Sequence, residues 1–362
     1  MQILQTIRCF FRILRKIERR QIILMNLAPI DTDIIIIGAG PTGLFTVFEA
    51  GLLKLRCHLI DYLPQAGGQL TEIYPKKPIY DIPGFPEVLA GDLVDGLMKQ
   101  IAPFKPGFTL GERAEFIEKT DDGKFKITTH KGKVHIAPVI AIAGGLGCFE
   151  PRKPPIENIT DFEDKGIEYI IKEPEFYRNK RIVIAGGGDS ALDWTIFLAD
   201  IASEIVMIHR RKAFRGALDS VEKVEKLAAE GRIKLVTEAQ VVGLGGDAKL
   251  EWVEIEQNAS DNFKIECDHF IPLFGLSPKL GPIGEWGLQI DRSAVEVNTF
   301  DYSTNVHGIF AIGDINSYPG KLKLILCGFH EATLMVQSAF KIIHPEKKVQ
   351  FKYTTVNGVE GF

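Results

Sequence analysis

The stretch DIIIIGAGPTGLFTVFEAGLLKLRCHLID (Asp33–Asp61) decides the fold. Four consecutive isoleucines predict a buried strand, and the turn Gly38-x-Gly40-x-x-Gly43 follows it directly. In such a turn the first glycine permits the tight bend, the second lets a pyrophosphate approach the backbone, and the third lets helix and strand pack closely. A helix-like segment and a second strand come next, and that strand ends at Asp61, which can accept hydrogen bonds from ribose hydroxyls. The stretch therefore predicts a dinucleotide-binding βαβ unit.

A second copy of the pattern lies in RIVIAGGGDSALDWTIFLADIASEIVMIHRRKAFR (Arg181–Arg215). The residue 23 positions after its first glycine is His209, whereas the first copy has Asp61 at that distance. Arginines follow His209, and a guanidinium can hold a 2′-phosphate that a carboxylate would repel. The alternative is a solvated basic loop, but its register with the glycines favours NADP(H) over NAD(H). The expected NADP contacts are Gly186, Gly188, Asp189, Ser190, His209, Arg210, Arg211 and Arg215.

Two different dinucleotides explain the repetition, and 362 residues are enough for two domains. The first site can hold the ADP half of FAD. Two later segments support a flavin over a second nicotinamide: VIAIAGG (Val139–Gly145), expected to be the strand that closes the FAD domain, and STNVHGIFAIGDI (Ser303–Ile315), which ends in a Gly-Asp pair of a type found in FAD- and NADPH-dependent oxidoreductases. FAD-type elements thus lie on both sides of the NADP segment.

We therefore expect a discontinuous FAD domain, residues 31–148 and 275–362, with the NADP domain, residues 149–274, inserted into it. The crossings GCFEPRKPP (147–155) and FGLSPKLGP (274–282) contain Pro and Gly suited to paired hinge strands. A hinge would let the nicotinamide swing toward the flavin and away from it. Rigid connectors of the same composition remain the alternative.

Composition limits the class of protein and its compartment. The chain has five cysteines, no C-x-x-C pair and no Cys/His cluster at zinc spacing, which predicts a reducing, cytoplasmic location without a metal site. The net charge is −4, and residues 1–30 hold six Lys/Arg against a single acid, so the remainder of the chain is more acidic than the whole. Nucleic-acid binding through bulk charge is therefore not expected.

Residues 1–30 form a separate N-terminal extension. Apolar residues and arginines lie on different faces of a helical pattern, which predicts a basic amphipathic helix. No apolar run approaches the roughly 18–20 residues of a membrane span, and no signal-peptide cleavage pattern is present. We expect an upstream start, with Met25 as the working initiator. Membrane association or targeting follows only if the helix is functional.

From about Asp31 to its end, the chain resembles the thioredoxin-reductase-like flavoproteins. Thioredoxin reductases carry a redox C-x-x-C shortly before a segment like FYRNK, whereas YIIKEPEFYRNK (Tyr169–Lys180) has no cysteine. The chain is more similar to the ferredoxin–NADP⁺ reductases of this fold, which are homodimers without that cysteine pair. The matching motifs, apart from the second glycine turn and HRRKAFR, are GGQLTEIYPKKPIYDIPGFP (Gly67–Pro86) and GKLKLILCGFHEA (Gly320–Ala332).

The resemblance implies an α/β fold of the three-layer ββα type, with two Rossmann-like domains for FAD and NADPH. It also implies which residues touch the flavin. Tyr74 would stack on one flavin face, although a packing role is equally compatible with its Gly/Pro-rich loop. Tyr353, in the C-terminal tail, would cover the other face. The expected FAD contacts are Gly38, Gly40, Pro41, Thr42, Gly43, Asp61, Gln69, Tyr74, Ala114, Phe149, Asp314 and Thr355.

The implied activity needs no catalytic side chain. NADPH would pass hydride to flavin N5, and single electrons would then pass to ferredoxin or a similar iron–sulfur protein, or the flow would reverse. Lys76, Lys77, Lys321 and Lys323 are candidates for a basic patch that receives an acidic partner. The alternatives are an enzyme with another acceptor, such as a thioredoxin-like disulfide, a quinone or free flavin, and a non-catalytic nucleotide-sensing protein.

Overall fold

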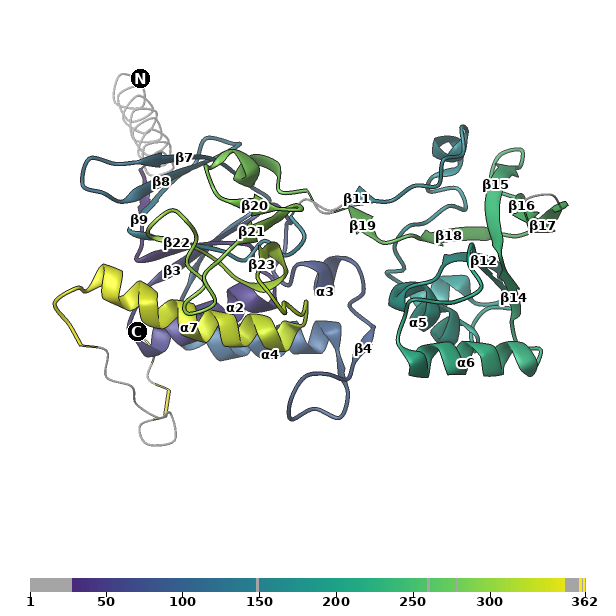
Figure 1. The fold of residues 1–362 in the computed structure, drawn as a ribbon, viewed down its shortest axis with the longest axis horizontal. Coiled ribbons are helices and arrows are strands. Elements are labelled where there is room, and N and C mark those ends of the chain that lie inside the picture. Colours follow the sequence, from purple (N-terminus) through teal and green to yellow (C-terminus); the bar gives the residue numbers. More distant parts are fainter. Residues whose placement is uncertain are drawn as a thin grey trace, which may run out of the picture. The chain divides into compact units, whose positions relative to one another are not determined.

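The computed structural model describes residues 28–147, 150–258, 261–277, 279–348, 358, 359 and 361. The chain divides into two compact units, of which unit 1 comprises Met1–Glu72, Lys77–Gly147 and Leu280–Phe362, and unit 2 comprises Ile73–Lys76 and Cys148–Lys279. Each unit contains its own parallel sheet, antiparallel strands and helices (Figure 1). In the part of the chain described, no helix is long and apolar enough to cross a membrane.

The parallel sheet of unit 1 joins segments from both ends of the chain. In spatial order its strands are β22 (Ile309–Ala311), β10 (Val139–Ile142), β2 (Ile34–Ile37), β3 (Cys57–Asp61) and β6 (Gly107–Leu110). All neighbouring strands in this sheet run parallel. All four residues of β2 are buried, which explains its unbroken run of isoleucines, because both faces of the sheet are covered.

Helices cover one face of this sheet and antiparallel strands cover the other (Figure 1). The helices are α2 (Pro41–Leu52), α3 (Gln69–Glu72), α4 (Ala90–Ile101) and α7 (Ile325–Ile343). The second sheet consists of β7 (Ala114–Lys119), β8 (Phe125–Thr129), β9 (Val134–Ala137) and β1 (Ile30–Asp31). Ile35 and Ile37 of β2 share a buried cluster with Ile127 of β8, so the two sheets bury a common core.

Short strands complete unit 1 around this core. They are β4 (Pro78–Ile79) with β5 (Val88–Leu89), and β20 (Ile290–Asp291), β21 (Ala294–Glu296) and β23 (Asn316–Ser317) in a small third sheet.

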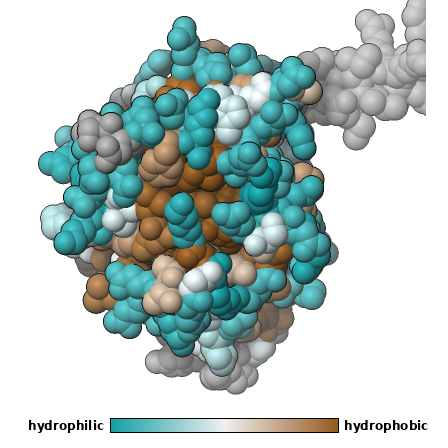
Figure 2. Space-filling view, turned by 90° about the vertical axis from the view of Figure 1, so that its right-hand side faces the viewer, coloured by the Kyte–Doolittle hydropathy of each residue, from teal (hydrophilic) through white to brown (hydrophobic). Residues whose placement is uncertain are grey.

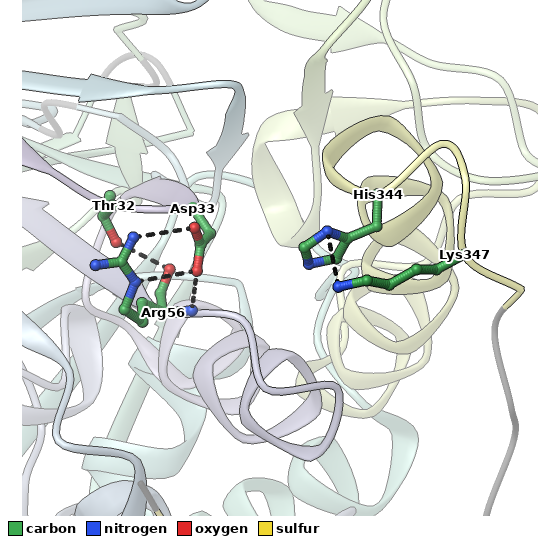
Figure 3. Close-up of polar contacts among 5 residues, drawn as sticks. All are labelled: Thr32, Asp33, Arg56, His344 and Lys347. Carbon is green, nitrogen blue, oxygen red and sulfur yellow. Dashed lines mark hydrogen bonds and ion pairs between the residues drawn. The ribbon is translucent and has the colours of Figure 1, made fainter.

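At the start of β2 and β3, the Arg56 guanidinium and backbone N–H donate to the Asp33 carboxylate, and Thr32 Oγ1 donates to the Arg56 carbonyl at 2.9 Å (Figure 3). Beyond α7, Lys347 Nζ lies 3.4 Å from His344 Nδ1 (Figure 3). The exposed Arg56–Asp33 and Lys347–His344 contacts contribute little free energy, but the Asp33 bonds fix how the two strands begin.

Unit 2 is built around a second parallel sheet. In spatial order its strands are β14 (Lys234–Thr237), β13 (Glu204–His209), β12 (Arg181–Gly186) and β18 (His269–Leu273). The helices α5 (Asp189–Leu198) and α6 (Leu218–Ala229) pack on this sheet (Figure 1). An antiparallel sheet of β15 (Ala239–Gly245), β16 (Trp252–Gln257) and β17 (Asp261–Glu266) accompanies it, and β11 (Glu150–Pro151) pairs with β19 (Leu276–Ser277).

Successive residues of β12 enter two different cores. Val183 belongs to the cluster shared with the antiparallel strands, whereas Ile182 and Ile184 belong to the cluster under the helices. The alternation follows the two-residue period of a strand, and it explains why the segment is apolar throughout. Figure 2, which faces one end of unit 2, shows that apolar side chains also reach the surface there, within a surround of hydrophilic ones. Burial in unit 2 is therefore incomplete on this face.

Candidate functional site

The first glycine turn lies between β2 and α2. Gly38 has a φ of +108°, and a Cβ there would overlap the Ala143 carbonyl, so only glycine fits. Gly40 is the N-cap of α2, has no side chain to cap the helix, and faces open space, since a Cβ on it would meet nothing within 4 Å. The free N–H groups and the positive end of the helix dipole therefore face space that an anionic group can occupy.

Asp61 closes this turn from the end of β3. Its Oδ2 accepts the Ala39 N–H at 2.6 Å, and its Oδ1 accepts the Leu63 N–H at 2.8 Å. Burial raises the pKa of the Asp61 carboxyl, and these two backbone hydrogen bonds oppose the rise. Each carboxylate oxygen keeps a further lone pair that can accept a hydroxyl. Asp61 thus fixes the glycine turn and remains able to bind ribose.

Two more segments with predicted FAD contacts meet this turn. Gly67 N–H donates to the Ala39 carbonyl at 2.8 Å, which brings the start of α3 and Gln69 close to the turn. The 3₁₀ turn Gly313–Ile315 carries Asp314, and a Cβ on Gly313 would lie 3.1 Å from Thr42 Oγ1. Burial raises the pKa of the Asp314 carboxyl. The structure thus gathers Gln69, Thr42 and Asp314 around the first glycine turn.

The remaining predicted FAD contacts have different outcomes. Ala114, at the start of β7, is buried in the unit 1 core. Tyr74 belongs to unit 2, where it packs against the cluster under α5 and α6, so its stacking on the flavin stays a prediction. Phe149, Tyr353 and Thr355 lie outside the described residues, as does nearly all of the N-terminal extension.

The second glycine turn, between β12 and α5, repeats the geometry of the first. A Cβ on Gly186 would lie 2.6 Å from the Ala191 Cβ and 2.7 Å from the Leu273 carbonyl oxygen. Gly188 is the N-cap of α5 and carries no capping side chain. A Cβ on Gly188 would meet no atom within 4 Å, so this residue faces open space. Ser190 is exposed in the first turn of α5. This turn, like the first, leaves backbone N–H groups free for an anion.

His209 occupies the position of Asp61 but faces the protein. Its ring stacks on Phe214, with centroids 4.8 Å apart, and its Nε2–H donates to the Ala213 carbonyl at 3.1 Å. A Cβ on Gly187 would overlap this ring, which explains why a glycine also stands between Gly186 and Gly188. This extra glycine is the signal in the sequence that a ring packs against the turn. Burial lowers the pKa of His209, and the adjacent arginines lower it further. His209 therefore supports the turn as a neutral ring.

The basic loop after His209 is tied to the glycine turn by further bonds. Arg215 N–H donates to the Gly187 carbonyl at 2.8 Å, and Ala217 N–H donates to Asp189 Oδ1 at 2.7 Å. The side chains of Arg210, Arg211 and Arg215 are exposed, and within the described residues they have no hydrogen bond or ion pair. Three guanidinium groups are thus available to an anion beside the turn. The Asp189 carboxylate, in contrast, accepts a backbone hydrogen bond from the end of the loop.

Lys76 and Lys321, both expected in a basic patch, have carboxylate partners. Lys321 is buried and pairs with Glu331, its side chain being only 7% exposed. Lys76 Nζ lies 2.7 Å from Glu173 Oε1. The prediction that Lys321 belongs to a surface patch was wrong, because ten residues of sequence separate it from a buried partner on α7 that no local pattern reveals. Lys323 is exposed.

The comparisons with known proteins agree on the family. Residues 32–338 match the model of the pyridine nucleotide-disulphide oxidoreductases. A protein of Flavobacterium johnsoniae named ferredoxin–NADP reductase is 70% identical over 92% of this chain and 95% of its own length. One of the same name from Bradyrhizobium diazoefficiens is 49% identical over 90% of this chain and 95% of its own length.

Solved structures agree on the fold. The thioredoxin reductase of Lactococcus lactis superposes with a TM-score of 0.76 at 22% identity, over 87% of this chain and 99% of that protein. That of T. acidophilum gives a TM-score of 0.75 at 22% identity, over 86% and 98%. The chain therefore has an α/β fold like that of thioredoxin reductase, with parallel sheets consistent with dinucleotide-binding domains.

Proposed function

Because the chain belongs to the pyridine nucleotide-disulphide oxidoreductase family, and within it to the ferredoxin–NADP reductases, we propose that it transfers electrons between NADPH and ferredoxin through bound FAD. The observation that carries the proposal is the difference between the two glycine turns. One has a carboxylate, Asp61, that can accept ribose hydroxyls, and the other has three unpaired arginines that can hold a 2′-phosphate.

We further propose that unit 1 is the FAD domain, of the three-layer ββα type, and that unit 2 is an NADP domain inserted into it. The glycine turn of unit 1, Asp61 and Asp314 lie together, as an FAD site requires. Gly40 and Gly188 leave room for a pyrophosphate at the two helix N-termini. We also propose that the chain forms a homodimer, like the ferredoxin–NADP⁺ reductases that it resembles. Size-exclusion chromatography with light scattering tests this.

In this function the chain binds and orients the cofactors. Bound FAD supplies the conversion between a two-electron donor and a one-electron acceptor. The residues of unit 1 hold the flavin nucleotide through the α2 N-terminus and Asp61, and those of unit 2 select NADPH through Arg210 and Arg211. Positioning of this kind, without a general acid or base, is sufficient for hydride and electron transfer.

The cysteines favour ferredoxin over a disulfide as acceptor. The segment Tyr169–Lys180 has no cysteine, and the sequence has no C-x-x-C pair. Burial raises the pKa of Cys57, and it raises the pKa of Cys267 to about 12, so neither thiol forms a reactive thiolate at neutral pH. A thiol relay through these two residues is therefore not available.

Turnover with purified acceptors tests the function. The protein should be yellow, should bleach when NADPH is added without oxygen, and should reduce ferredoxin but not thioredoxin. NADPH with an artificial one-electron acceptor serves as the positive control for a competent flavin. Thioredoxin-dependent disulfide reduction at a rate comparable to that with ferredoxin would exclude the proposal, and binding of both cofactors without flavin bleaching would indicate a nucleotide sensor.

A further inference from the structure

A buried carboxylate, Glu331, lies beneath the turn that carries Asp314. Glu331 is on α7 and is fully buried, at 0% exposure. Its Oε2 accepts the Gly313 N–H at 2.6 Å and Asn316 Nδ2 at 2.8 Å. Its Oε1 accepts the Tyr318 hydroxyl at 2.8 Å and forms the ion pair with Lys321. One carboxylate thus collects four donors from a single short segment of the chain.

These donors enclose Asp314. Gly313 directly precedes it and Asn316 follows two residues later, so Glu331 binds the chain on both sides of Asp314. Gly313 has a φ of +76°, a left-handed conformation that the bond from its N–H to Glu331 helps to hold. The orientation of the Asp314 turn therefore depends on a side chain from another element.

The same helix also contacts the first turn of α2. A Cβ on Gly328, which lies one helical turn before Glu331, would overlap the Thr42 side chain. Thr42 in turn faces Gly313. The helix α7 thus touches two segments that we assign to FAD binding, and Glu331 is its buried polar contact with one of them.

A buried charge of this kind requires a reason. Burying a carboxylate costs several kcal/mol unless it is paired and hydrogen-bonded, and apolar residues of similar size often stabilise a core as well. Stability alone therefore does not account for the arrangement. What an apolar residue cannot do is accept the Gly313 N–H and Asn316 Nδ2 together and so define one conformation of the turn.

We propose that Glu331, paired with Lys321, is a positioning residue that holds the Gly313–Asp314 turn in its flavin-binding conformation before FAD arrives. The inference rests on the proposed function, in which Asp314 contacts FAD. Glu331 itself is buried beneath the turn and acts only through it. Preorganisation of this kind raises affinity because binding no longer bears the cost of ordering the turn.

FAD affinity of the apoprotein tests the proposal. We expect Glu331→Gln to weaken FAD binding about 10- to 100-fold, since hydrogen bonds to a charged acceptor are lost. The dissociation constant is measured by quenching of flavin fluorescence, while circular dichroism reports folding of the apoprotein. NADPH affinity, a property of unit 2, should not change. The matched control is Lys341→Met, an exposed lysine at the far end of the helix that carries Glu331, which should bind FAD within about twofold of the wild type.

Two more variants keep the test decisive. Tyr318→Phe removes one donor and leaves the ion pair, so it should fold and weaken FAD binding about 3- to 10-fold. The double variant Glu331→Gln/Lys321→Met removes both charges. If the pair served only to balance charge, the double variant would bind FAD like the wild type, and the proposal would be overturned. If Glu331→Gln unfolds the apoprotein, Tyr318→Phe decides.

Asp314→Asn separates failure of the inference from failure of the function. If Asp314→Asn weakens FAD binding while Glu331→Gln and Tyr318→Phe do not, the positioning role is refuted and the proposed function stands. If Asp314→Asn leaves FAD affinity unchanged, the assignment of the turn is wrong and the inference falls with it. Flavin bleaching by NADPH in the wild type reports the function independently of every variant.

Discussion

The two glycine turns share a backbone design and differ in the residue that supports it from the next strand. In unit 1 the Asp61 carboxylate binds the Ala39 N–H, and in unit 2 the neutral His209 ring lies against Gly187. Both residues hold their turn in place from the end of the second strand. The charges beside the two turns are opposite. The Asp61 carboxylate is negative, whereas His209 is neutral and the exposed arginines that follow it are positive.

The comparison teaches that one position can combine a structural and a selective role. Asp61 supports the turn through bonds that still leave lone pairs for a ligand. His209 supports its turn through packing and a bond to the Ala213 carbonyl, so ligand selection passes to the exposed loop that follows. In unit 1, a substitution of Asp61 should therefore impair both the support of the turn and ligand binding. In unit 2, substitutions in the loop should change ligand selection without disturbing the turn.

The largest effect is expected from Asp61→Ala. It leaves the Ala39 and Leu63 N–H groups without their acceptor and removes the proposed ribose contact, so FAD binding should weaken about 100- to 1,000-fold. Flavin content after purification and the FAD dissociation constant measure it. Asp61→Asn, which keeps the shape and one acceptor, should lie between. The NADPH/NADH preference should stay the same, and a change in that ratio would reverse our assignment of the two sites.

Arg210→Ala or Arg211→Ala should each weaken NADPH binding about 10- to 100-fold, since hydrogen bonds to a charged group contribute roughly 1.5–3 kcal/mol. NADH has no 2′-phosphate and should bind as before, so the preference collapses while the rate at saturation is kept. Titration with both nucleotides measures this, and Lys212→Ala is the control from the same loop. Equal losses for NADPH and NADH would show that the arginines do not read the 2′-phosphate.

Acid should destabilise unit 1 more than unit 2. His58 of β3 and His135 of β9 are buried on either side of Thr109 Oγ1, at 2.8 and 3.0 Å from their Nε2 atoms. Burial lowers the pKa of each ring to about 4. Because unfolding restores a pKa of about 6.5, the stabilisation is complete above pH 6.5 and is lost as the pH falls toward 4.

Between pH 7 and pH 5 this loss should be about 2 kcal/mol per ring. Calorimetry of the apoprotein across this range measures it as a fall in the unfolding temperature of unit 1. His135→Gln should flatten the dependence, and the exposed His330→Gln is the control. An unfolding temperature that stays constant from pH 7 to pH 5 would contradict the lowered pKa values.

The smallest effect is expected from deleting residues 1–24. The contacts described for both glycine turns involve residues beyond Ile30, so flavin content, NADPH affinity and turnover should equal those of the full chain. Absorbance of bound flavin and steady-state rates measure this. Loss of FAD in the truncated protein would show that the extension belongs to the site and is more than an upstream start.

Elements with strong local signals were predictable from the sequence. The isoleucine run of β2 and the Gly-x-Gly turns carry their own signals, and β2 and β12 occupy the apolar runs that directly precede the two turns. Long-range contacts have no such signal. The four donors of Glu331 meet only because β22 pairs with β10 and thereby brings the Gly313 turn against α7. The orientation of His209 was equally unpredictable from the sequence. It depends on stacking against Phe214, and the conformation of the loop decides where that ring lies.

The parallel sheet of unit 1 also has a consequence for biosynthesis. Its strand β10 ends at Ile142, and the partner β22 begins only at Ile309, after the whole of unit 2. At about 5–20 residues per second, the ribosome needs roughly 10 to 30 seconds to make the intervening chain. During that interval β10 is an unpaired apolar edge, the kind of strand that invites aggregation. The edge of β10 in the nascent chain therefore has to be protected from aggregation until β22 has been synthesised.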